Sequence, residues 1–270
     1  MRLDVYLVEA GHAKSRVRAK ELIEGGKVVF DGRVVKKASF AVCEGEHSVT
    51  VTEELPYVSR GGLKLEAALD AFSIDASNKV ALDIGASTGG FTDCLLQRGA
   101  AYVSAVDAGQ GQLDAKLCQD PRVRSYEHMN ARELTPDAVG GTFDLIVMDV
   151  SFISAGYILP RFSALLRADG EAVVLIKPQF EVGRALLGKG GVVRDPSAHK
   201  AAILRVMESA EASGLTAVGL IASPIEGGDG NREFLIRLVH RQSTSRTISP
   251  ELIEKVIRNR AEQRGGGIQC

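Results

Sequence analysis

The sequence predicts an α/β fold, a doubly wound and mostly parallel sheet with helices on both faces, preceded by a small basic α+β domain. Two observations support this. From about residue 80 onward, short apolar runs alternate with helical patterns. Residues 1–40 instead contain nine Lys or Arg against five Asp or Glu, although the whole chain has a net charge of -1. A length of 270 residues leaves room for one full α/β domain and a smaller unit.

The first 55 residues predict a compact unit of two short helices followed by strands. Residues 15–24 have the apolar spacing of a helix, with Ser15 as the N-cap. Asp31 and Gly32 form a dipeptide that is typical of hairpin turns. The strands are expected at residues 27–30, 33–35 and 48–52. A basic unit at one end of a nearly neutral protein indicates either a polyanionic partner or a charged, solvated surface.

Strand and helix patterns alternate through the larger domain. Residues 91–98 and 196–213 predict helices, the second with Asp195 as N-cap and Pro196 at its first position. We expect domain boundaries at 1–55 for the small domain, 56–62 for a linker, 63–243 for the α/β domain, and 244–270 for a tail that is helical around 250–263 or disordered. The strand-like runs lie at 80–84, 102–106, 144–148, 172–176, 217–222 and 234–239.

The composition argues against a metal site, a disulfide framework and a membrane protein. Cys43, Cys94, Cys118 and Cys270 are scattered without the spacing of zinc ligands. The N-terminus is too charged for a signal peptide, and no run approaches the roughly 20 apolar residues that span a bilayer. We therefore expect a cytoplasmic protein.

The loop after the first strand of the α/β domain predicts a cofactor site. Residues 83–92 read D-x-G-x-x-x-G-G-F-T and open a helix, which is where doubly wound sheets bind ligands. The dinucleotide pattern G-x-G-x-x-G is absent from this loop. The loop instead resembles motif I of the S-adenosylmethionine-dependent methyltransferases, and Asp107, at the end of the next strand, is placed to accept hydrogen bonds from ribose hydroxyls. A tight turn that binds no ligand is the alternative interpretation.

The type of methyl acceptor can be narrowed by what the sequence lacks. Methylation of exocyclic amines typically uses an (Asp/Asn)-Pro-Pro-aromatic box, but residues 148–152 contain no proline. Methylation of cytosine at carbon 5 needs a nucleophilic Cys beside proline or threonine, and none of the four Cys has that context. Hydroxyl methylation remains, and it needs a base, for which a Lys serves when burial and a neighbouring cation lower its pKa.

Four charged residues then form a pattern along the chain. Lys64, Asp149, Lys177 and Glu233 match, in order, the Lys-Asp-Lys-Glu tetrad of FtsJ-like RNA ribose 2′-O-methyltransferases. Each residue taken alone could be an ordinary surface charge. Together with the S4-like basic domain, the run 55–65 and the motifs DIGASTGGFTD, DVSFIS and IKPQFE, they resemble the TlyA family, often labelled hemolysins.

This resemblance implies a fold and an activity. The fold is a Rossmann-like methyltransferase domain with a mostly parallel seven-stranded sheet, behind an S4-like RNA-binding domain. The activity is S-adenosylmethionine-dependent ribose 2′-O-methylation of cytidine in 16S or 23S ribosomal RNA, or in both. One departure is Tyr57 in the linker, where actinobacterial members have Trp.

The resemblance also implies residue roles. Lys177 is expected to take the 2′-hydroxyl proton, with Lys64 lowering its pKa and with Asp149 and Glu233 orienting the two lysines. The loop 181–194 is interpreted as an RNA-facing lid or as a plain surface loop. The expected cofactor-binding residues are Asp83, Gly85, Ala86, Ser87 and Gly89, with Asp107 at the ribose and Asn130 at the adenine. The expected RNA-binding residues are Lys14, Arg16, Arg18, Lys20 and Arg60.

Three rival functions remain to be compared. A non-catalytic RNA-binding assembly factor could keep the fold without the reaction, but the intact tetrad argues against it. A membrane-active hemolysin would need a cationic amphipathic or spanning segment. A small-molecule O-methyltransferase would leave the basic domain without a role.

Overall fold

A computed structural model describes residues 1–43, 45, 47–51, 56–183, 186–241 and 247–258. The chain divides into two compact units, Met1–Arg60 and Gly61–Cys270. This division falls inside the stretch 56–62 that was expected to be a linker. Each unit is described by itself below.

The smaller unit has the order of elements that the sequence predicts. Ser15 caps the second helix, because its Oγ accepts a hydrogen bond from the backbone N–H of Arg18 at 3.2 Å. The strands form an antiparallel sheet in the order β2-β1-β3, with the hairpin turn at Asp31 and Gly32. Leu7, Ile23 and Val28 are completely buried in its core. The elements are α1 (Leu3–Glu9), α2 (Arg16–Glu24), β1 (Val28–Phe30), β2 (Arg33–Val34) and β3 (Val49–Val51).

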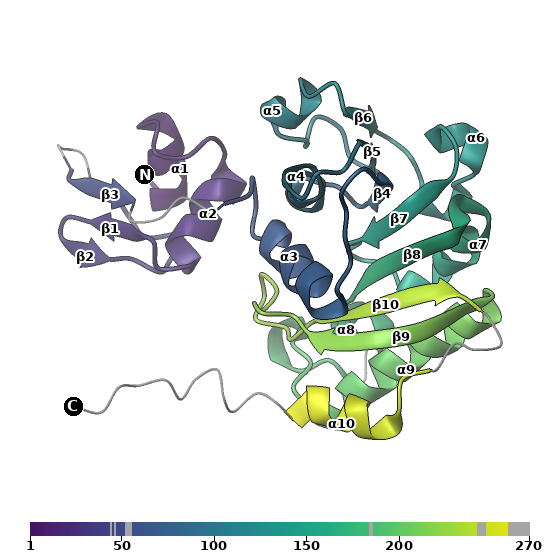
Figure 1. The fold of residues 1–270 in the computed structure, drawn as a ribbon. Helices are drawn as coiled ribbons and strands as arrows, with labels where there is room; N and C mark the ends of the chain where they lie inside the picture. The colour runs from purple at the N-terminus through teal and green to yellow at the C-terminus, as the bar shows by residue number, and fades with distance from the viewer. Residues whose placement is uncertain (44, 46, 52–55, 184–185, 242–246, 259–270) are drawn as a thin grey trace. The chain divides into compact units, whose positions relative to one another are not determined.

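The larger unit is built on the mostly parallel seven-stranded sheet that was expected. The strand order is β6-β5-β4-β7-β8-β10-β9, and β10 runs antiparallel to both of its neighbours (Figure 1). The strands are β4 (Val80–Ile84), β5 (Tyr102–Val106), β6 (Val123–Tyr126), β7 (Phe143–Met148), β8 (Leu166–Ile176), β9 (Leu215–Ala222) and β10 (Phe234–His240). β6 was not predicted, because this edge strand has the sequence VRSY, with two exposed polar residues at its centre.

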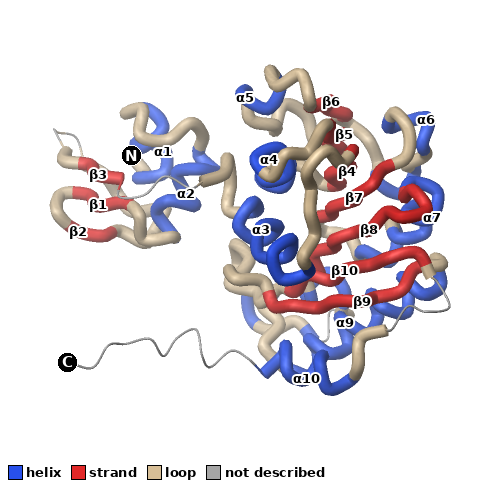
Figure 2. Tube along the Cα trace, in the orientation of Figure 1, coloured by secondary structure: helices blue, strands red, loops and turns tan. Residues whose placement is uncertain are grey.

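Helices cover both faces of this sheet (Figure 2). α3 (Gly61–Phe72) packs against α4 (Gly90–Gln97), β9 and β10, whereas α9 (Pro196–Ala212) packs against β8 and β9 and is itself covered by α10 (Pro250–Arg258). The part of the predicted tail helix beyond residue 258 lies outside the described residues. The remaining helices are α5 (Ala115–Cys118), α6 (Pro136–Val139), α7 (Phe162–Leu165) and α8 (Pro178–Glu181), with 3-10 turns η1 (Ala131–Glu133), η2 (Ala155–Tyr157), η3 (Leu159–Arg161) and η5 (Lys189–Gly191).

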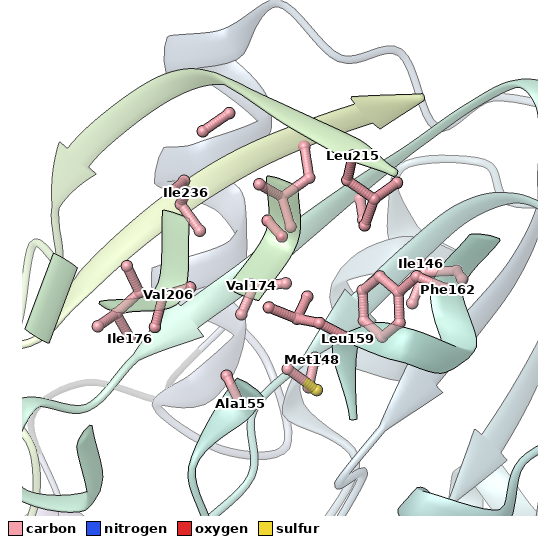
Figure 3. Close-up of a cluster of buried hydrophobic side chains, with 14 of the residues drawn as sticks. Ile146, Met148, Ala155, Leu159, Phe162, Val174, Ile176, Val206, Leu215 and Ile236 are labelled. Atoms are coloured by element: carbon pink, nitrogen blue, oxygen red, sulfur yellow. The ribbon is translucent and has the colours of Figure 1, made fainter. Parts of the chain in front are cut away.

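The core on the α9 side fixes the strand ends that matter for the site. Met148 at the end of β7, Ile176 at the end of β8 and Ile236 on β10 have no exposed surface, and they pack with Phe162 and Val206 (Figure 3). Burying each such side chain contributes roughly 1.5–3 kcal/mol. The residues that directly follow Met148 and Ile176 therefore start from rigid positions.

Candidate active site

The loop between β4 and α4 passes so close to the end of β7 that a residue with a side chain would not fit at Gly85. Gly85 has φ +84°, and a Cβ at this position would lie 2.4 Å from the carbonyl oxygen of Asp149. Gly89 has φ +94° and precedes the first residue of α4. Both glycines are therefore required by the backbone path and the close packing. The loop opens a helix at the carboxyl edge of the sheet, as the sequence predicts.

Asp83 is a buried carboxylate with one unused oxygen. The residue has no exposed surface, and its Oδ2 accepts a hydrogen bond from Thr92 Oγ1 at 2.7 Å. Its Oδ1 is buried without a hydrogen-bond partner in the described structure. Burial is the main cause that raises the pKa of Asp83 to about 7. An orphaned buried oxygen next to the glycine loop fits a ligand that brings a hydrogen-bond donor or a positive charge.

A cavity of about 610 Å³ lies over this loop and is large enough for a nucleoside-sized ligand. Five residues expected at the cofactor or the reaction lie on its wall: Gly85, Ser87, Asp107, Asn130 and Asp149. The other expected residues do not line it: Asp83, Ala86, Gly89, Lys64, Lys177 and Glu233. Ala86 is buried in the loop itself.

Two of the wall residues already have local partners. The carboxylate of Asp107 accepts hydrogen bonds from the backbone N–H of Ser87 at 2.8 Å and of Gly109 at 2.7 Å, which fixes its position at the end of β5. Asn130 accepts from the backbone N–H of Arg132 and donates to Glu133 Oε1, so its side chain caps the following 3-10 turn. Its amide is therefore occupied locally, and a role at the adenine rests on its place at the wall alone.

Sheet register brings three of the four tetrad residues to one edge. Asp149 follows β7 and Lys177 follows β8, and these two strands are parallel neighbours. β10 pairs antiparallel with β8, with Phe234 opposite Ile176, so Glu233 comes opposite Lys177. Lys64 is supplied by α3, which packs on β9 and β10.

The tetrad consists of two close ion pairs. Lys64 Nζ lies 2.5 Å from Glu233 Oε2, and Lys177 Nζ lies 2.5 Å from Asp149 Oδ1. Burial is the largest cause that raises the pKa of Glu233, with repulsion from Asp149 adding to it and attraction to Lys64 opposing it. The charge of Lys177 also acts on Glu233. The four predicted residues therefore form one interacting cluster whose opposite charges compensate.

Two neighbouring residues were missed by the sequence analysis. Ser151 lines the cavity, and its Oγ accepts a hydrogen bond from Lys177 Nζ at 2.8 Å. Phe152 also lines the cavity, yet it is 91% exposed and has φ +65°, a conformation that costs energy for a bulky residue. Its ring contacts that of Phe180, with centroids 5.2 Å apart. Both residues belong to the motif DVSFIS. The sequence alone does not show that Ser151 contacts Lys177, or that Phe152 is exposed with a positive φ.

The basic residues expected at RNA lie on the smaller unit. Lys14, Arg16 and Lys20 are exposed, while Arg18 and Arg60 are partly buried. Lys20 is 3.8 Å from Glu24 and Arg18 is 3.8 Å from Glu21, so both have acidic neighbours on α2.

An arginine outside the predicted set lies close to Arg16. The buried carboxylate of Asp4 accepts hydrogen bonds from Arg2 Nε at 2.9 Å and from Arg16 Nη2 at 3.4 Å. Asp4 thereby holds two guanidinium groups side by side on the surface of this unit.

The loop 181–194, interpreted as an RNA-facing lid or a plain surface loop, is fixed at its C-terminal part. Asn231 is 1% exposed; its side chain accepts a hydrogen bond from the backbone N–H of Val193 at 2.9 Å and donates to Gly191 O at 3.2 Å. Residues 184–185 lie outside the described residues.

Within the described part of the chain, no three His, Cys, Asp or Glu side chains are grouped to hold a metal. No helix of that same part is both long and apolar enough to cross a membrane.

Comparison with known proteins agrees with this geometry. Residues 57–239 match the model of the FtsJ-like methyltransferases, and residues 1–48 match the S4 domain. The chain is 46% identical over 257 residues to the 16S/23S rRNA (cytidine-2′-O)-methyltransferase TlyA of Mycobacterium tuberculosis, covering 95% of each chain. It is 40% identical to hemolysin A of Brachyspira hyodysenteriae, covering 88% of this chain and all of that one.

A solved structure shares both units. A Streptococcus thermophilus protein, provisionally described as a hemolysin, matches with a TM-score of 0.76 and 41% identity over 95% of this chain and 94% of its own. The resemblance to the TlyA family that the motifs indicate is thus confirmed. The chain belongs to the TlyA family, in which an S4 domain precedes an FtsJ-like methyltransferase domain.

Proposed function

We propose that this protein is an S-adenosylmethionine-dependent methyltransferase of ribosomal RNA. In this proposal it modifies the ribose 2′-hydroxyl of cytidine in 16S or 23S RNA, or in both. Lys177 is the general base. The observation that carries the proposal is the pair of lysine–carboxylate contacts, one of which borders the cavity through Asp149. The names of the relatives support the substrate. Such a substrate implies action in the cytoplasm, where ribosomes are.

The residues present fit the cofactor. Asp83 has a buried oxygen without a partner beside the loop, Gly85 and Gly89 allow the backbone path of the loop, and Asp107 holds a carboxylate at the cavity wall. We assign Ser87, with Ala86 beside it in the loop, to the methionine end of the cofactor, and Asn130 at the cavity wall to the adenine. S-adenosylmethionine, when bound, supplies an electrophilic methyl group.

The tetrad residues prepare the acceptor. Lys177, in its neutral form, accepts the proton of the 2′-hydroxyl at Nζ. The contact with Asp149 Oδ1 and the hydrogen bond to Ser151 Oγ hold this Nζ in place. Lys64, held by the buried Glu233, positions the ribose. Alignment of the acceptor contributes most of the acceleration.

Recognition of RNA is assigned to two places. The exposed Lys14, Arg16 and Lys20 of the S4 domain contact phosphates and give an affinity that falls with salt. Phe152 presents an exposed ring at the cavity and is suited to stack on a base that has been extracted from its helix. Extraction costs a few kcal/mol, which such stacking offsets in part.

The test is methyl transfer from radiolabelled S-adenosylmethionine to separated ribosomal subunits that lack the modification. We expect one labelled ribose in each RNA that is a substrate, resistant to alkaline hydrolysis, and a loss of about 10²–10⁴-fold in kcat for Lys177→Ala. Lys79→Ala is the matched control. Lys79 Nζ forms an ion pair with Glu171 Oε1 at a distance of 2.8 Å, and neither residue lines the cavity. It should retain kcat.

The outcomes separate the base from the class of enzyme. Full activity of Lys177→Ala would remove Lys177 as the base but leave the methyltransferase in place. No label on any subunit or RNA, while S-adenosylmethionine still binds, would instead favour a non-catalytic assembly factor.

A further inference from the structure

Glu181 is a buried carboxylate that the proposed reaction does not use. It ends α8, the four-residue helix that begins directly after Lys177, and it is only 3% exposed. A buried charge is costly unless hydrogen bonds compensate it, and burial does raise the pKa of Glu181. Its position at the last residue of IKPQFE therefore needs an explanation.

The carboxylate of Glu181 binds the segment that follows β7. Its Oε1 accepts a hydrogen bond from the backbone N–H of Ala155 at 2.8 Å, and its Oε2 accepts from Ser154 Oγ at 2.6 Å. Both oxygens thus bind the start of η2. The backbone oxygen of Glu181 in turn accepts a hydrogen bond from Arg205 on α9, which fixes the end of α8 to the scaffold.

The same two segments meet at the reacting end. Lys177 is paired with Asp149 and donates to Ser151, and Phe180 contacts Phe152. Residues 149–154 are thus held between Met148 and Ala155, both of which are anchored in the core (Figure 3). Without Glu181, the Ala155 end would lose both of its hydrogen bonds to α8 and would keep only apolar packing and the hydrogen bonds within its own turn.

We propose that Glu181 is a positioning residue, which ties the segment 149–155 to α8 and so sets Asp149, Ser151 and Phe152 relative to Lys177. The inference rests on the proposed function for its catalytic consequence only. Glutamate suits this task because an ionised carboxylate is an acceptor only and can satisfy an N–H and an O–H together. Misplacement of a reacting group by about 1 Å can cost on the order of 10²-fold in rate.

The first measurement reads the segment without any reaction. The chain contains no Trp, so Phe152→Trp introduces a single fluorescent reporter at the segment. In this background we expect Glu181→Ala to lower the tryptophan anisotropy, Glu181→Gln to lower it less, and Glu171→Ala to leave it unchanged. Glu171 is the matched control, since it is a buried glutamate on β8 that binds Lys79 and Arg237.

The second measurement uses the protein with Phe152 intact. We expect Glu181→Ala to lower kcat for methyl transfer about 10–100-fold, with partial rescue by Glu181→Gln and no comparable loss in Glu171→Ala. If Glu181→Ala does not fold, Ser154→Ala, which removes one of the two contacts, should show both effects in milder form.

An unchanged anisotropy, or equal kcat losses in the Glu181 and Glu171 variants at equal loss of thermal stability, would overturn the positioning role. Absence of activity in the wild-type protein would count against the proposed function instead. The anisotropy result would still decide on Glu181.

Discussion

The unused oxygen of Asp83 leads to a prediction about stability. In the folded protein the pKa of Asp83 is raised from 3.8 to about 7, chiefly because its carboxyl group is buried. Between these two values the folded state keeps the proton while the unfolded state loses it, so stability falls as the pH rises from about 4 to about 7. At about 1.4 kcal/mol for each pH unit, the full difference corresponds to about 4 kcal/mol.

The substitution Asp83→Asn removes this ionisation while it keeps the size of the side chain. The new amide leaves one buried N–H₂ group without a partner, at a cost of about 1–3 kcal/mol that does not depend on pH. The pH-dependent part is therefore the informative one. Relative to wild type, the variant should gain about 3 kcal/mol in free energy of unfolding on going from pH 5 to pH 8. For a unit of this size, the difference in Tm should change by about 6–12 °C.

Differential scanning calorimetry of the full chain without cofactor measures this difference and separates the transitions of the two units. Asp70→Asn is the control, because the contact with Arg98 holds the pKa of Asp70 below its usual value, so it remains ionised throughout this range. A Tm difference between wild type and Asp83→Asn that is the same at pH 5 and pH 8 would refute a buried, protonated Asp83. The same variant should bind S-adenosylmethionine more weakly at pH 8, as isothermal titration would show.

Two further predictions concern the S4 domain. Replacing Lys14, Arg16 and Lys20 by Ala should weaken RNA binding and flatten the plot of log K against log[salt] by about 0.7–0.9 for each lost phosphate contact; an unchanged slope would remove these residues from the interface. The hydrogen bonds of His47 to Cys43 O and then to Asp31 raise the pKa of His47 above 6.5. The contribution of these hydrogen bonds to the stability of this unit should be complete below pH 6.5 and be lost as the pH rises through the folded pKa. An NMR titration midpoint of His47 at or below pH 6.5 would contradict this prediction.

Much of the fold follows from local patterns that the sequence displays openly. The apolar runs gave β4, β5, β7, β8, β9 and β10, and the Asp195-Pro196 pair marked the start of α9. β6 and α3 were missed. The first is a polar edge strand, and the second begins in a stretch that resembled a linker because of Gly61 and Gly62. β6 lacks the alternating hydrophobic pattern of a strand, whereas α3 has the helical spacing at Leu65, Ala68, Leu69 and Phe72 and was hidden only by its glycine-rich start.

The cluster itself could be predicted only through family resemblance. No local pattern indicates that Lys64 meets Glu233, because 169 residues separate them and the contact depends on how α3 packs on the sheet. Glu181 and Ser151 were invisible for a related reason. Their importance comes from a partner in another motif, and only the structure brings DVSFIS and IKPQFE together.

The position of Glu233 depends on the one strand that breaks the parallel pattern. In a parallel sheet, the residue before a strand lies at the amino edge, whereas ligands bind at the carboxyl edge. Glu233 precedes β10, so a parallel β10 would have placed it on the wrong side of the sheet. Because β10 runs antiparallel to β8, its start coincides with the end of β8, and Glu233 comes opposite Lys177. The reversed strand is therefore a condition for the tetrad, which a uniformly parallel sheet with the same residues could not assemble.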